Sequence, residues 1–391
     1  MIHLPKQISP MRVALVYNQK KEESTQQSLT DESSEPPSLK GEVSQSKFLL
    51  QNIKPFHTQI SDTYAEWDTL ETIDAVQNAL SEDHEVYLIE ADEQAYNKLS
   101  VERPDIVFNI AEGIDGVSRE AQIPAILEML RIPYTGSDPL SLAICLDKSR
   151  AKEILAYYRI PTPAFQVVSS KLDVPNVSLD FPCIVKPLHE GSSKGIFNSS
   201  IVSNRIEMER EILIILERYN EPALVEEYLK GREFTVAILG NGNDLTVLPI
   251  VEIKFDTLPQ GVNPIYSYEA KWIWDQASAP IDIFSCPANI SPQLRQEIET
   301  ICRKAYTILR CRDWCRIDVR LDSEGRSHIL ELNPLPGILP KPEDNSCFPK
   351  AARAAGISYN KLIQTVLTLG AMRCGLVAVS NLSSYKHEVP A

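Results

Sequence analysis

Two strand-like segments, CRIDVRL and SHILELN, carry side chains that suit a metal ion bound to phosphate. Asp318 lies on the first segment, and Glu331 and Asn333 lie two apart on the second, so these last two face the same side of a strand. Such oxygen donors are what Mg²⁺ requires, with phosphate oxygens and water completing the octahedron. Arg316 shares the face of Asp318 and is placed to neutralise a transferring phosphoryl group. The alternative is a surface hairpin, but apolar neighbours predict half-buried carboxylates, which need cations.

Two lysines and a loop of small residues could hold phosphate. Lys148 opens a predicted helix, and Lys186 ends the strand-like run CIVK, followed by the loop 190–195, EGSSKG. Lysine supplies a point charge for phosphate, glycines let backbone N–H groups approach oxyanions, and serine hydroxyls add donors. The loop does not match the P-loop pattern. Taken alone, each lysine is better explained as an ordinary solvated side chain, and it is the loop after Lys186 that favours phosphate binding.

The segment ALVEEYLKGREFTVAILG (223–240) reads as strand, turn and strand with acidic residues at the turn. Glu226 and Glu227 could accept the adenine amino group, while backbone groups meet the ring edge and Glu233 binds ribose. An acidic edge of an ordinary β-hairpin explains this segment alone at least as well.

The elements that must position these residues begin with an N-terminal α/β unit. Strands are predicted at 12–18, 84–91 and 104–110, with helices over 66–80 and over 118–130, the second capped by Ser118. This alternation predicts a parallel, doubly wound sheet over 11–137, with the Asn109–Gly116 loop at the end where such sheets bind ligands. The polar stretch 19–47 predicts a mobile loop.

Two further units follow. Helices are predicted at 147–158, 204–219, 291–309 and onward to about 374, and strands at 181–187, 196–202, 223–229, 232–240 and 245–254. NGN (241–243) predicts a hairpin, and a long loop carries Trp272 and Trp274. The expected domains are 1–137, a central unit 138–240 with the phosphate lid, a C-terminal unit 241–376 with the magnesium site, and a loose tail 377–391.

Composition narrows the function classes. The chain has 391 residues and a formal charge of −14, which argues against general binding to nucleic acid or to a membrane surface. No apolar run is long enough to span a membrane, and the N-terminus lacks the apolar core of a signal peptide. The eight scattered cysteines predict reduced, mostly buried thiols in a cytosolic protein rather than a zinc site.

These pieces together resemble the ATP-grasp superfamily, and specifically its D-alanine–D-alanine ligase-like branch. The resemblance covers about 104–370 and rests on the order and spacing of IPYTGSDPL…DKSRAK, PCIVKPLHEGSSKG, VEEYLKGREFTVAILG, YEAKW, RIDV, LELNPLPG and PKAARAAGISY. It implies a three-domain fold, α/β in the N-terminal part and α+β in the ATP-binding half, with the nucleotide between two antiparallel sheets.

The resemblance also implies roles for particular residues. Those matching ATP contacts are Lys148, Lys186, Glu226, Tyr228, Leu229, Glu233 and Lys271, with Ser192 and Ser193 in a lid over the phosphates. Asp318, Glu331 and Asn333 match magnesium ligands, and Arg316 and Gly337 match residues that support the oxyanion of a tetrahedral intermediate. The implied reaction uses ATP and two Mg²⁺ ions to phosphorylate a carboxylate, and an amine then displaces phosphate. A homodimer is implied as well.

Departures from the family pattern fall on the side that faces the substrates. No glutamate can be aligned in YNQKKEESTQQS, where the peptidoglycan enzyme has one that binds the first D-alanine. Trp272 replaces a tyrosine, and Ile114 replaces an acidic residue, leaving Glu112 and Asp115 as candidates. Ser346 keeps its place three before Pro349 despite an insertion. A changed pocket around intact phosphoryl-transfer residues indicates a different substrate pair.

We therefore expect an amino-acid ligase of secondary metabolism, such as a mycosporine-type ligase that activates an enolised ring ketone (a vinylogous acid). The two tryptophans could pack against such a ring, although core packing explains them equally well. A dipeptide ligase, and then a true D-alanine–D-alanine ligase, are the next alternatives. A non-catalytic ATP-binding protein and a carboxylate phosphotransferase that needs no amine also remain open.

Overall fold

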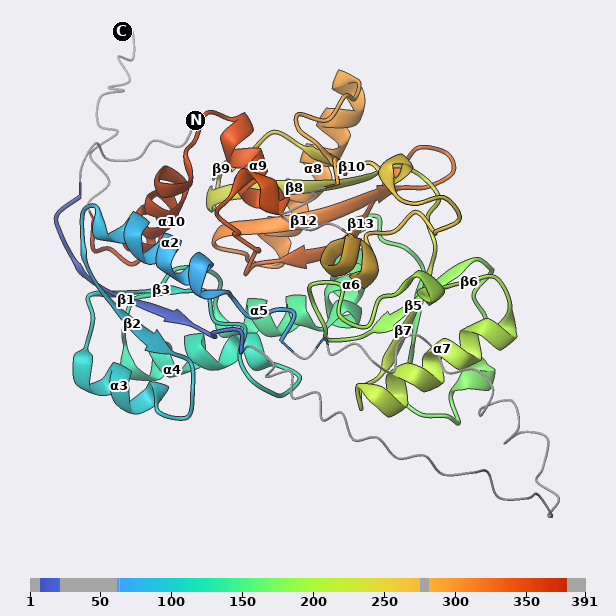
Figure 1. Cartoon of the computed structure of the whole chain (residues 1–391), viewed down its shortest axis with the longest axis horizontal. Helices are drawn as coiled ribbons and strands as arrows, with labels where there is room; N and C mark the ends of the chain where they lie inside the picture. The colour runs from blue at the N-terminus through green and yellow to red at the C-terminus, as the bar shows by residue number, and fades with distance from the viewer. Residues whose placement is uncertain (1–7, 22–61, 63, 275–280, 378–391) are drawn as a thin grey trace, which may run out of the picture.

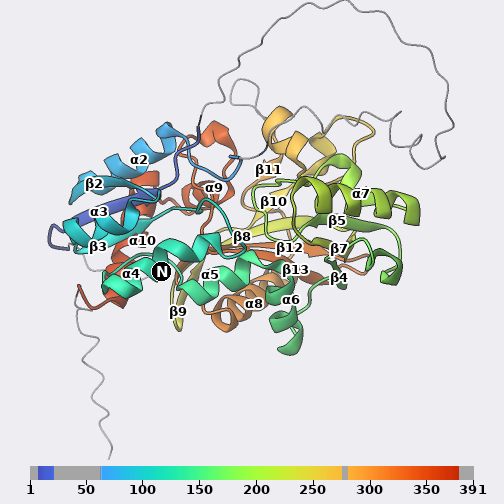
Figure 2. The same ribbon diagram turned by 90° about the horizontal axis from the view of Figure 1, so that it is seen from below.

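The computed structural model describes residues 8–21, 62, 64–274 and 281–377, and within these the strands form three sheets (Figure 1). Nearly all of the polar stretch 19–47, and the tail beyond residue 377, lie outside the described residues. Figures 1 and 2 show the N-terminal unit and the four-stranded unit at opposite ends of the molecule, with the largest sheet between them.

The N-terminal sheet is parallel, in the order β2-β1-β3, and its strands are Arg12–Tyr17 (β1), Glu85–Glu90 (β2) and Ile106–Asn109 (β3). Alternate residues of β1 enter two different cores, Val13 and Leu15 on one face and Ala14 and Val16 on the other. Helix α2 (Leu70–Ser81) covers the first face, and α3 (Ala95–Glu102) and α4 (Gln122–Leu130) cover the second. The predicted doubly wound sheet is confirmed.

Two details of the predicted N-terminal helices are wrong. Helix α2 begins at Leu70 and not at residue 66, because the Thr69 side chain accepts a hydrogen bond from Thr72 N and caps the helix there. Ser118 precedes a 3₁₀ turn, Arg119–Ala121, that leads into α4, and its side chain makes no capping bond.

The second sheet is antiparallel, in the order β4-β7-β5-β6, with bounds Phe165–Val168 (β4), Cys183–Pro187 (β5), Ile201–Val202 (β6) and Ala223–Glu227 (β7). Helix α7 (Arg205–Arg218) packs Met208, Ile212 and Ile215 against it. The strand predicted at 196–202 is wrong except for β6 at its end. Asn198–Ser200 forms a 3₁₀ turn instead, in which Ser200 Oγ accepts from Phe197 N.

The third and largest sheet runs β11-β10-β8-β12-β13, with β9 paired to β8. Its strands are Glu233–Asn241 (β8), Asp244–Val247 (β9), Val251–Ile253 (β10), Phe284–Ser285 (β11), Asp313–Leu321 (β12) and Ser327–Asn333 (β13). The hairpin predicted at NGN joins β8 to β9. The single strand predicted at 245–254 is wrong, since it is interrupted around Pro249, which has no N–H to donate to a ladder.

Helices cover both faces of this large sheet. One core joins it to α5 (Pro139–Leu146), α6 (Lys148–Tyr157) and α8 (Pro292–Ile308). The opposite core joins it to α9 (Cys347–Ala354) and α10 (Tyr359–Arg373) and continues without a break into the N-terminal unit. Gln364 of α10 donates to the Ala79 carbonyl at the end of α2, 2.6 Å away.

The expected domain limits therefore need adjustment. The segment 223–240 is divided between two sheets, because β7 pairs with β4 and β5 while β8 pairs with β10 and β12. Helices α5 and α6 likewise pack on the large sheet. We propose the same three units with the central one limited to about 160–230, and with 138–158 assigned to the C-terminal unit.

Candidate active site

Polar residues of β12 and β13 lie side by side, and three of them (Arg316, Asp318 and Glu331) line a cavity of about 530 Å³ between the two antiparallel sheets. Asp318 is opposite Glu331, and Arg316 is opposite Asn333. Arg316 donates to both carboxylate oxygens of Asp318, at 3.1 Å from Nε and 3.0 Å from Nη2. Asn333 Nδ2 lies 3.3 Å from Asp318 Oδ2. The predicted shared faces of these four residues are confirmed.

The charges around this donor set suit a divalent cation. Burial opposes ionisation of Glu331, but Lys148, Lys186 and Arg316 outweigh it and lower the pKa of this carboxyl to about 2. Burial raises the pKa of Asp318 despite Arg316. Two carboxylates and an amide supply only oxygen ligands, which a hard cation such as Mg²⁺ prefers. The residues present therefore fit the metal, and Glu331 is held in the ionised form that a ligand needs.

Lys148 and Lys186 lie on the same side of this cluster. Asp147 caps α6 by accepting from Ser149 N and Arg150 N, which fixes Lys148 at the first turn. Lys148 Nζ donates to the Glu190 carbonyl at 2.6 Å and lies 3.8 Å from Glu331 Oε2. Lys186 Nζ, on β5, lies 3.3 Å from Glu226 Oε2. Both side chains are buried, so the reading of ordinary solvated lysines is wrong.

The far end of the large cavity is lined by the predicted nucleotide residues Glu226, Glu227, Tyr228, Leu229 and Glu233. Arg320 holds this group together: its Nη1 donates to Glu233 Oε2 at 2.7 Å and its Nη2 donates to Tyr228 Oη at 2.8 Å. Glu226 is buried and bridges two lysines, with Lys152 Nζ 3.0 Å from its Oε2. Glu226 therefore does not lie at a solvated edge of a hairpin, which was the alternative explanation of this segment.

At the opposite end, Lys271 and Gly337 face the cavity next to Arg316. Lys271 lies in a π-helical turn, Glu269–Trp274, where a long loop was predicted. Burial, and then the Arg316 guanidinium, lower the pKa of Lys271 to about 8. A Cβ added at Gly337 would meet no described protein atom within 4 Å, so its backbone is open to a ligand. Ser346 also lines the cavity and donates through Oγ to the Gly337 carbonyl at 2.9 Å.

The loop 190–195, called the lid below, closes over these residues. Ser192 and Ser193 have left-handed backbone angles (φ of 49° and 61°), a conformation rare for residues other than glycine. Ser193 Oγ donates to the Tyr266 carbonyl at 2.8 Å, and Trp272 Nε1 donates to the Ser192 carbonyl at 3.1 Å. Both serines line the large cavity, as does Trp272.

A smaller cavity, called the inner cavity below, adjoins the reaction end. Arg316, Lys271, Glu331 and Gly337 line one side, and the other side is acidic, formed by Glu66, Asp68, Glu112 and Glu120. Burial raises the pKa of Asp68 and of Glu120 to about 7, and it raises that of Glu112 well above its ordinary value. These carboxylates are crowded together, so a cation entering the cavity would relieve their repulsion.

Two residues expected near the substrates do not face either cavity. Asp115 is exposed in the loop that follows β3, where its carboxylate accepts from Gly116 N, and its role as a substrate contact stays a prediction. Trp274 packs against the core shared with the N-terminal unit. Only Trp272 of the pair is in a position to contact a ligand.

Several residues of the site were missed from the sequence. Glu66, which accepts from Gly191 N of the lid at 2.6 Å, precedes the cap of α2 and lies far from the first strand along the chain. Arg320 continues the alternation of Arg316 and Asp318 on β12, and Lys152 lies one helical turn after Lys148. Those two periodicities could have revealed them, whereas nothing in the local pattern singles out Glu66.

Among the described residues, neither a membrane-spanning helix nor a cluster of histidine, cysteine and acidic ligands is present. No described helix is both long and apolar enough to cross a membrane. Among the same residues, no group of three or more histidine, cysteine or acidic side chains is arranged to hold a metal, which leaves the mixed carboxylate and amide set of β12 and β13 as the metal-binding candidate.

Comparison with known proteins identifies the family. The model of the C-terminal part of D-Ala–D-Ala ligases matches residues 156–368. The D-alanine–D-alanine ligase of Bordetella parapertussis is 33% identical over 296 residues, covering 75% of this chain and 87% of that protein. An uncharacterised protein of Sinorhizobium fredii is 35% identical over 316 residues, covering 78% of this chain and 89% of its own length.

A solved structure shows the same fold. The D-alanine–D-alanine ligase of Bacillus anthracis complexed with ATP superposes with a TM-score of 0.61 at 20% identity, covering 94% of this chain and 99% of that one. The chain therefore belongs to the D-alanine–D-alanine ligase-like branch of the ATP-grasp superfamily, and it is an ADP-forming ligase that uses ATP and Mg²⁺ to make a C–N bond.

Proposed function

We propose that the protein activates the carboxylate of one amino acid and couples it to the amine of a second, forming a dipeptide. The observation that carries this proposal is the adjacency of the two cavities. Lys186 and Asp318 line the large cavity, and Lys148 and Asn333 line the inner cavity together with the acidic residues. The two cavities meet at Arg316, Lys271 and Glu331, which line both. A substrate placed between them would present its carboxylate to ATP and its ammonium to the acidic wall.

At the nucleotide end, we assign adenine and ribose to Glu226, Glu227, Tyr228, Leu229 and Glu233. Lys148, Lys186 and the lid serines Ser192 and Ser193 would bind the phosphates. Asp318, Glu331 and Asn333 would hold two Mg²⁺ ions, which when bound offset the charge of the transferring phosphoryl group. The closed lid would exclude water from the activated carboxyl group.

At the reaction end, Arg316 and the backbone of Gly337 are placed to stabilise the oxyanion that forms when the amine attacks. Lys271, whose pKa is lowered to about 8, adds a second positive charge beside Arg316. Ser346 orients the Gly337 carbonyl and lines the same cavity, so we assign it to the second substrate together with Trp272.

The acidic wall supports an amino acid as the substrate that is activated. An ammonium held by Glu66, Glu112 and neighbouring carboxylates stays protonated and cannot act as a nucleophile. It therefore belongs to the acyl donor, and the attacking amine must come from the other substrate. The S. fredii and Bordetella relatives share this family, and the latter bear the name D-alanine–D-alanine ligase.

A cyclic, enolised ketone of the mycosporine type is the second candidate acceptor. It is favoured by one observation, the indole of Trp272 at the wall of the large cavity, where it can pack against a ring. This candidate needs no ammonium at the acidic wall, so the two can be separated by their dependence on that wall. We also retain, as expectations, a homodimer and a cytosolic location.

The test is ADP release from Mg–ATP with purified full-length chain, first with pairs of D- and L-amino acids and then with cyclic enaminoketones, each product being weighed by mass spectrometry. A dipeptide mass with stoichiometric ADP supports the proposal. A condensed ring product supports the second candidate. ADP release with no condensed product would indicate a phosphotransferase, and tight ATP binding without any turnover would indicate a non-catalytic binding protein.

A further inference from the structure

We propose that Arg119 is a positioning residue that links the wall of the inner cavity to the closed lid. The proposal rests on the proposed function only in taking the lid to cover the nucleotide. Arg119 itself lines neither cavity. Its role would be to make closure of the lid depend on the carboxylate that forms the substrate wall.

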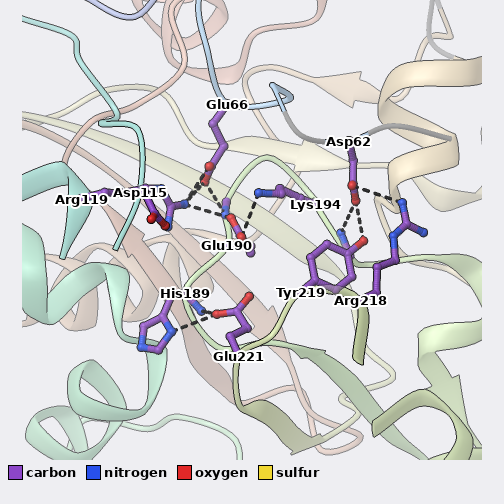
Figure 3. A network of polar contacts seen from close by, with 12 residues as sticks. Asp62, Glu66, Asp115, Arg119, His189, Glu190, Lys194, Arg218, Tyr219 and Glu221 are labelled. Atoms are coloured by element: carbon purple, nitrogen blue, oxygen red, sulfur yellow. Dashed lines mark hydrogen bonds and ion pairs between the residues drawn. The ribbon is translucent and has the colours of Figure 1, made fainter. Parts of the chain in front are cut away.

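The contacts of Arg119 join two segments far apart in the chain. Its Nη2 donates to both oxygens of Glu66, each at 2.7 Å, and to Glu190 Oε2 at 3.1 Å (Figure 3). The three side chains are largely removed from solvent, with relative exposures of 9%, 7% and 13%. Glu66 lines both cavities, whereas Glu190 is the first residue of the lid and lines the large one.

The lid is fitted closely against Glu66. Gly191 N donates to Glu66 Oε1, and a Cβ added at Gly191 would come within 2.6 Å of that same oxygen. Asp62, four residues before Glu66, accepts from Gly195 N at 3.2 Å and from Arg218 at 3.3 Å. Both ends of the lid are therefore held by carboxylates of the segment that leads into α2.

Arg119 neutralises two carboxylates that come together when the lid is closed, so closure of the lid depends on it. When the lid is closed, Glu66 and Glu190 approach the same guanidinium, and Glu190 also pairs with Lys194 of the lid at 2.9 Å. Without Arg119, two largely buried carboxylates would face each other with no shared cation. Opening would relieve this repulsion, since Glu190 would move to water. The loss of Arg119 should therefore favour the open lid more than it destabilises the fold.

This arrangement connects the two substrates. A ligand that binds the acidic wall sets the position of Glu66, and Glu66 in turn orients Arg119. Arg119 in this orientation binds the carboxylate of Glu190. The lid would thus close most firmly when the wall is occupied, which limits exposure of the activated carboxyl group to water before the amine arrives.

The lid itself carries a site at which its opening can be measured, because trypsin cleaves after Lys194.

The experiment measures the rate at which trypsin generates a new N-terminus at Gly195 in the full chain, with saturating Mg²⁺ and the non-hydrolysable analogue AMP-PNP. We expect Arg119→Ala and Glu190→Gln each to raise this rate on the order of tenfold, as expected for loss of a largely buried charge pair. The double variant should be no faster than Arg119→Ala alone. Glu217→Gln, which breaks the exposed Lys171–Glu217 pair, is the control and should leave the rate unchanged.

A second measurement separates positioning from folding. Arg119→Lys retains a charge without the planar fork, and it should restore much of the protection at an unchanged melting temperature. The proposal is overturned if Arg119→Ala and Glu190→Gln both fold and are cleaved at the wild-type rate, or if their effects add in the double variant. The assay requires no amine or carboxylate substrate, so a failure of the proposed dipeptide reaction would show instead as absent ADP release with a normally protected lid.

Discussion

The two ends of the active site are built in different ways. At the nucleotide end, the side chains stand on regular elements: Lys186 on β5, Glu226 on β7, Glu233 on β8, and the metal-binding candidates on β12 and β13. At the substrate end, Glu66, Glu112 and Ser346 lie in loops or just before a helix. The strand-borne end is rigidly spaced, whereas the loop-borne end can change its chemistry without disturbing the sheets.

The largest expected effect is at the strand-borne end. Glu331→Ala, or Asp318→Ala, should lower the rate of ADP formation at least a hundredfold, because each removes a charged ligand from the phosphoryl-transfer centre. The rate is measured by coupled ADP release, with circular dichroism as a check of folding. Glu324→Gln, in the exposed turn of the same β-hairpin, is the matched control. Near-normal turnover in either alanine variant would place the magnesium site elsewhere.

A smaller loss is expected from Lys186→Ala. The variant removes a buried cation from the phosphate path but leaves Glu226 paired with Lys152, so the fold should survive. We expect about a tenfold weaker affinity for ATP, corresponding to about 1.4 kcal/mol. Calorimetric titration with Mg–AMP-PNP measures it. Unchanged nucleotide affinity would count against any phosphate contact by this lysine.

A substitution at the loop-borne end should change the binding of the amino-acid substrate and not the binding of ATP. Glu112→Gln removes one carboxyl group that could pair with an ammonium at the acidic wall, and it should raise KM for the activated amino acid several-fold while leaving KM for ATP unchanged. Steady-state kinetics with each substrate varied in turn provide the comparison. Asp115→Asn, in the same loop but facing neither cavity, should change neither constant. A shift confined to KM for ATP would show that the two ends are not separable.

The smallest effect on catalysis is expected at His189, which lies between β5 and the lid and acts on stability instead. Burial opposes its charge, but hydrogen bonds to Asp147 and Glu221 raise its pKa from 6.5 to about 9. A raised pKa stabilises the folded protein fully below pH 6.5, and this contribution is lost as the pH rises through about 9. Urea unfolding at pH 6 and pH 10 should show that His189→Gln flattens the pH dependence by on the order of 2 kcal/mol. Equal slopes for both proteins would refute this assignment.

What could be predicted from the sequence follows the same division. Alternation along RIDV and LELN was enough to place Arg316, Asp318, Glu331 and Asn333 on one surface, because strand geometry has a fixed period. Glu66 could not be found this way, since its place depends on how the segment before α2 packs against Gly191 and Arg119. That Asp115 lines neither cavity could not be predicted either, because a loop gives no period from which to tell inward from outward.

The strand limits that were wrong, and the sheet to which β8 belongs, have related causes. Residues of β8 pair with β12, 73 or more positions further along the chain, as well as with the nearby β10, so the sheet to which β8 belongs could not be chosen from the local pattern. Proline at 249 broke a run that looked continuous, and Ser200 turned 198–200 into a 3₁₀ segment. In each case a contact or a missing donor outweighed β-propensity.

The packing of α10 against α2 has a consequence for biosynthesis. Leu362, Ile363, Val366 and Leu367 enter the same core as Ile73 and Val76 of α2, so part of the apolar surface of α2 stays uncovered until residues 359–373 have left the ribosome. Nascent chains that stop short of α10 should therefore be held by chaperones, and the first unit to be translated would be among the last to become resistant to proteases.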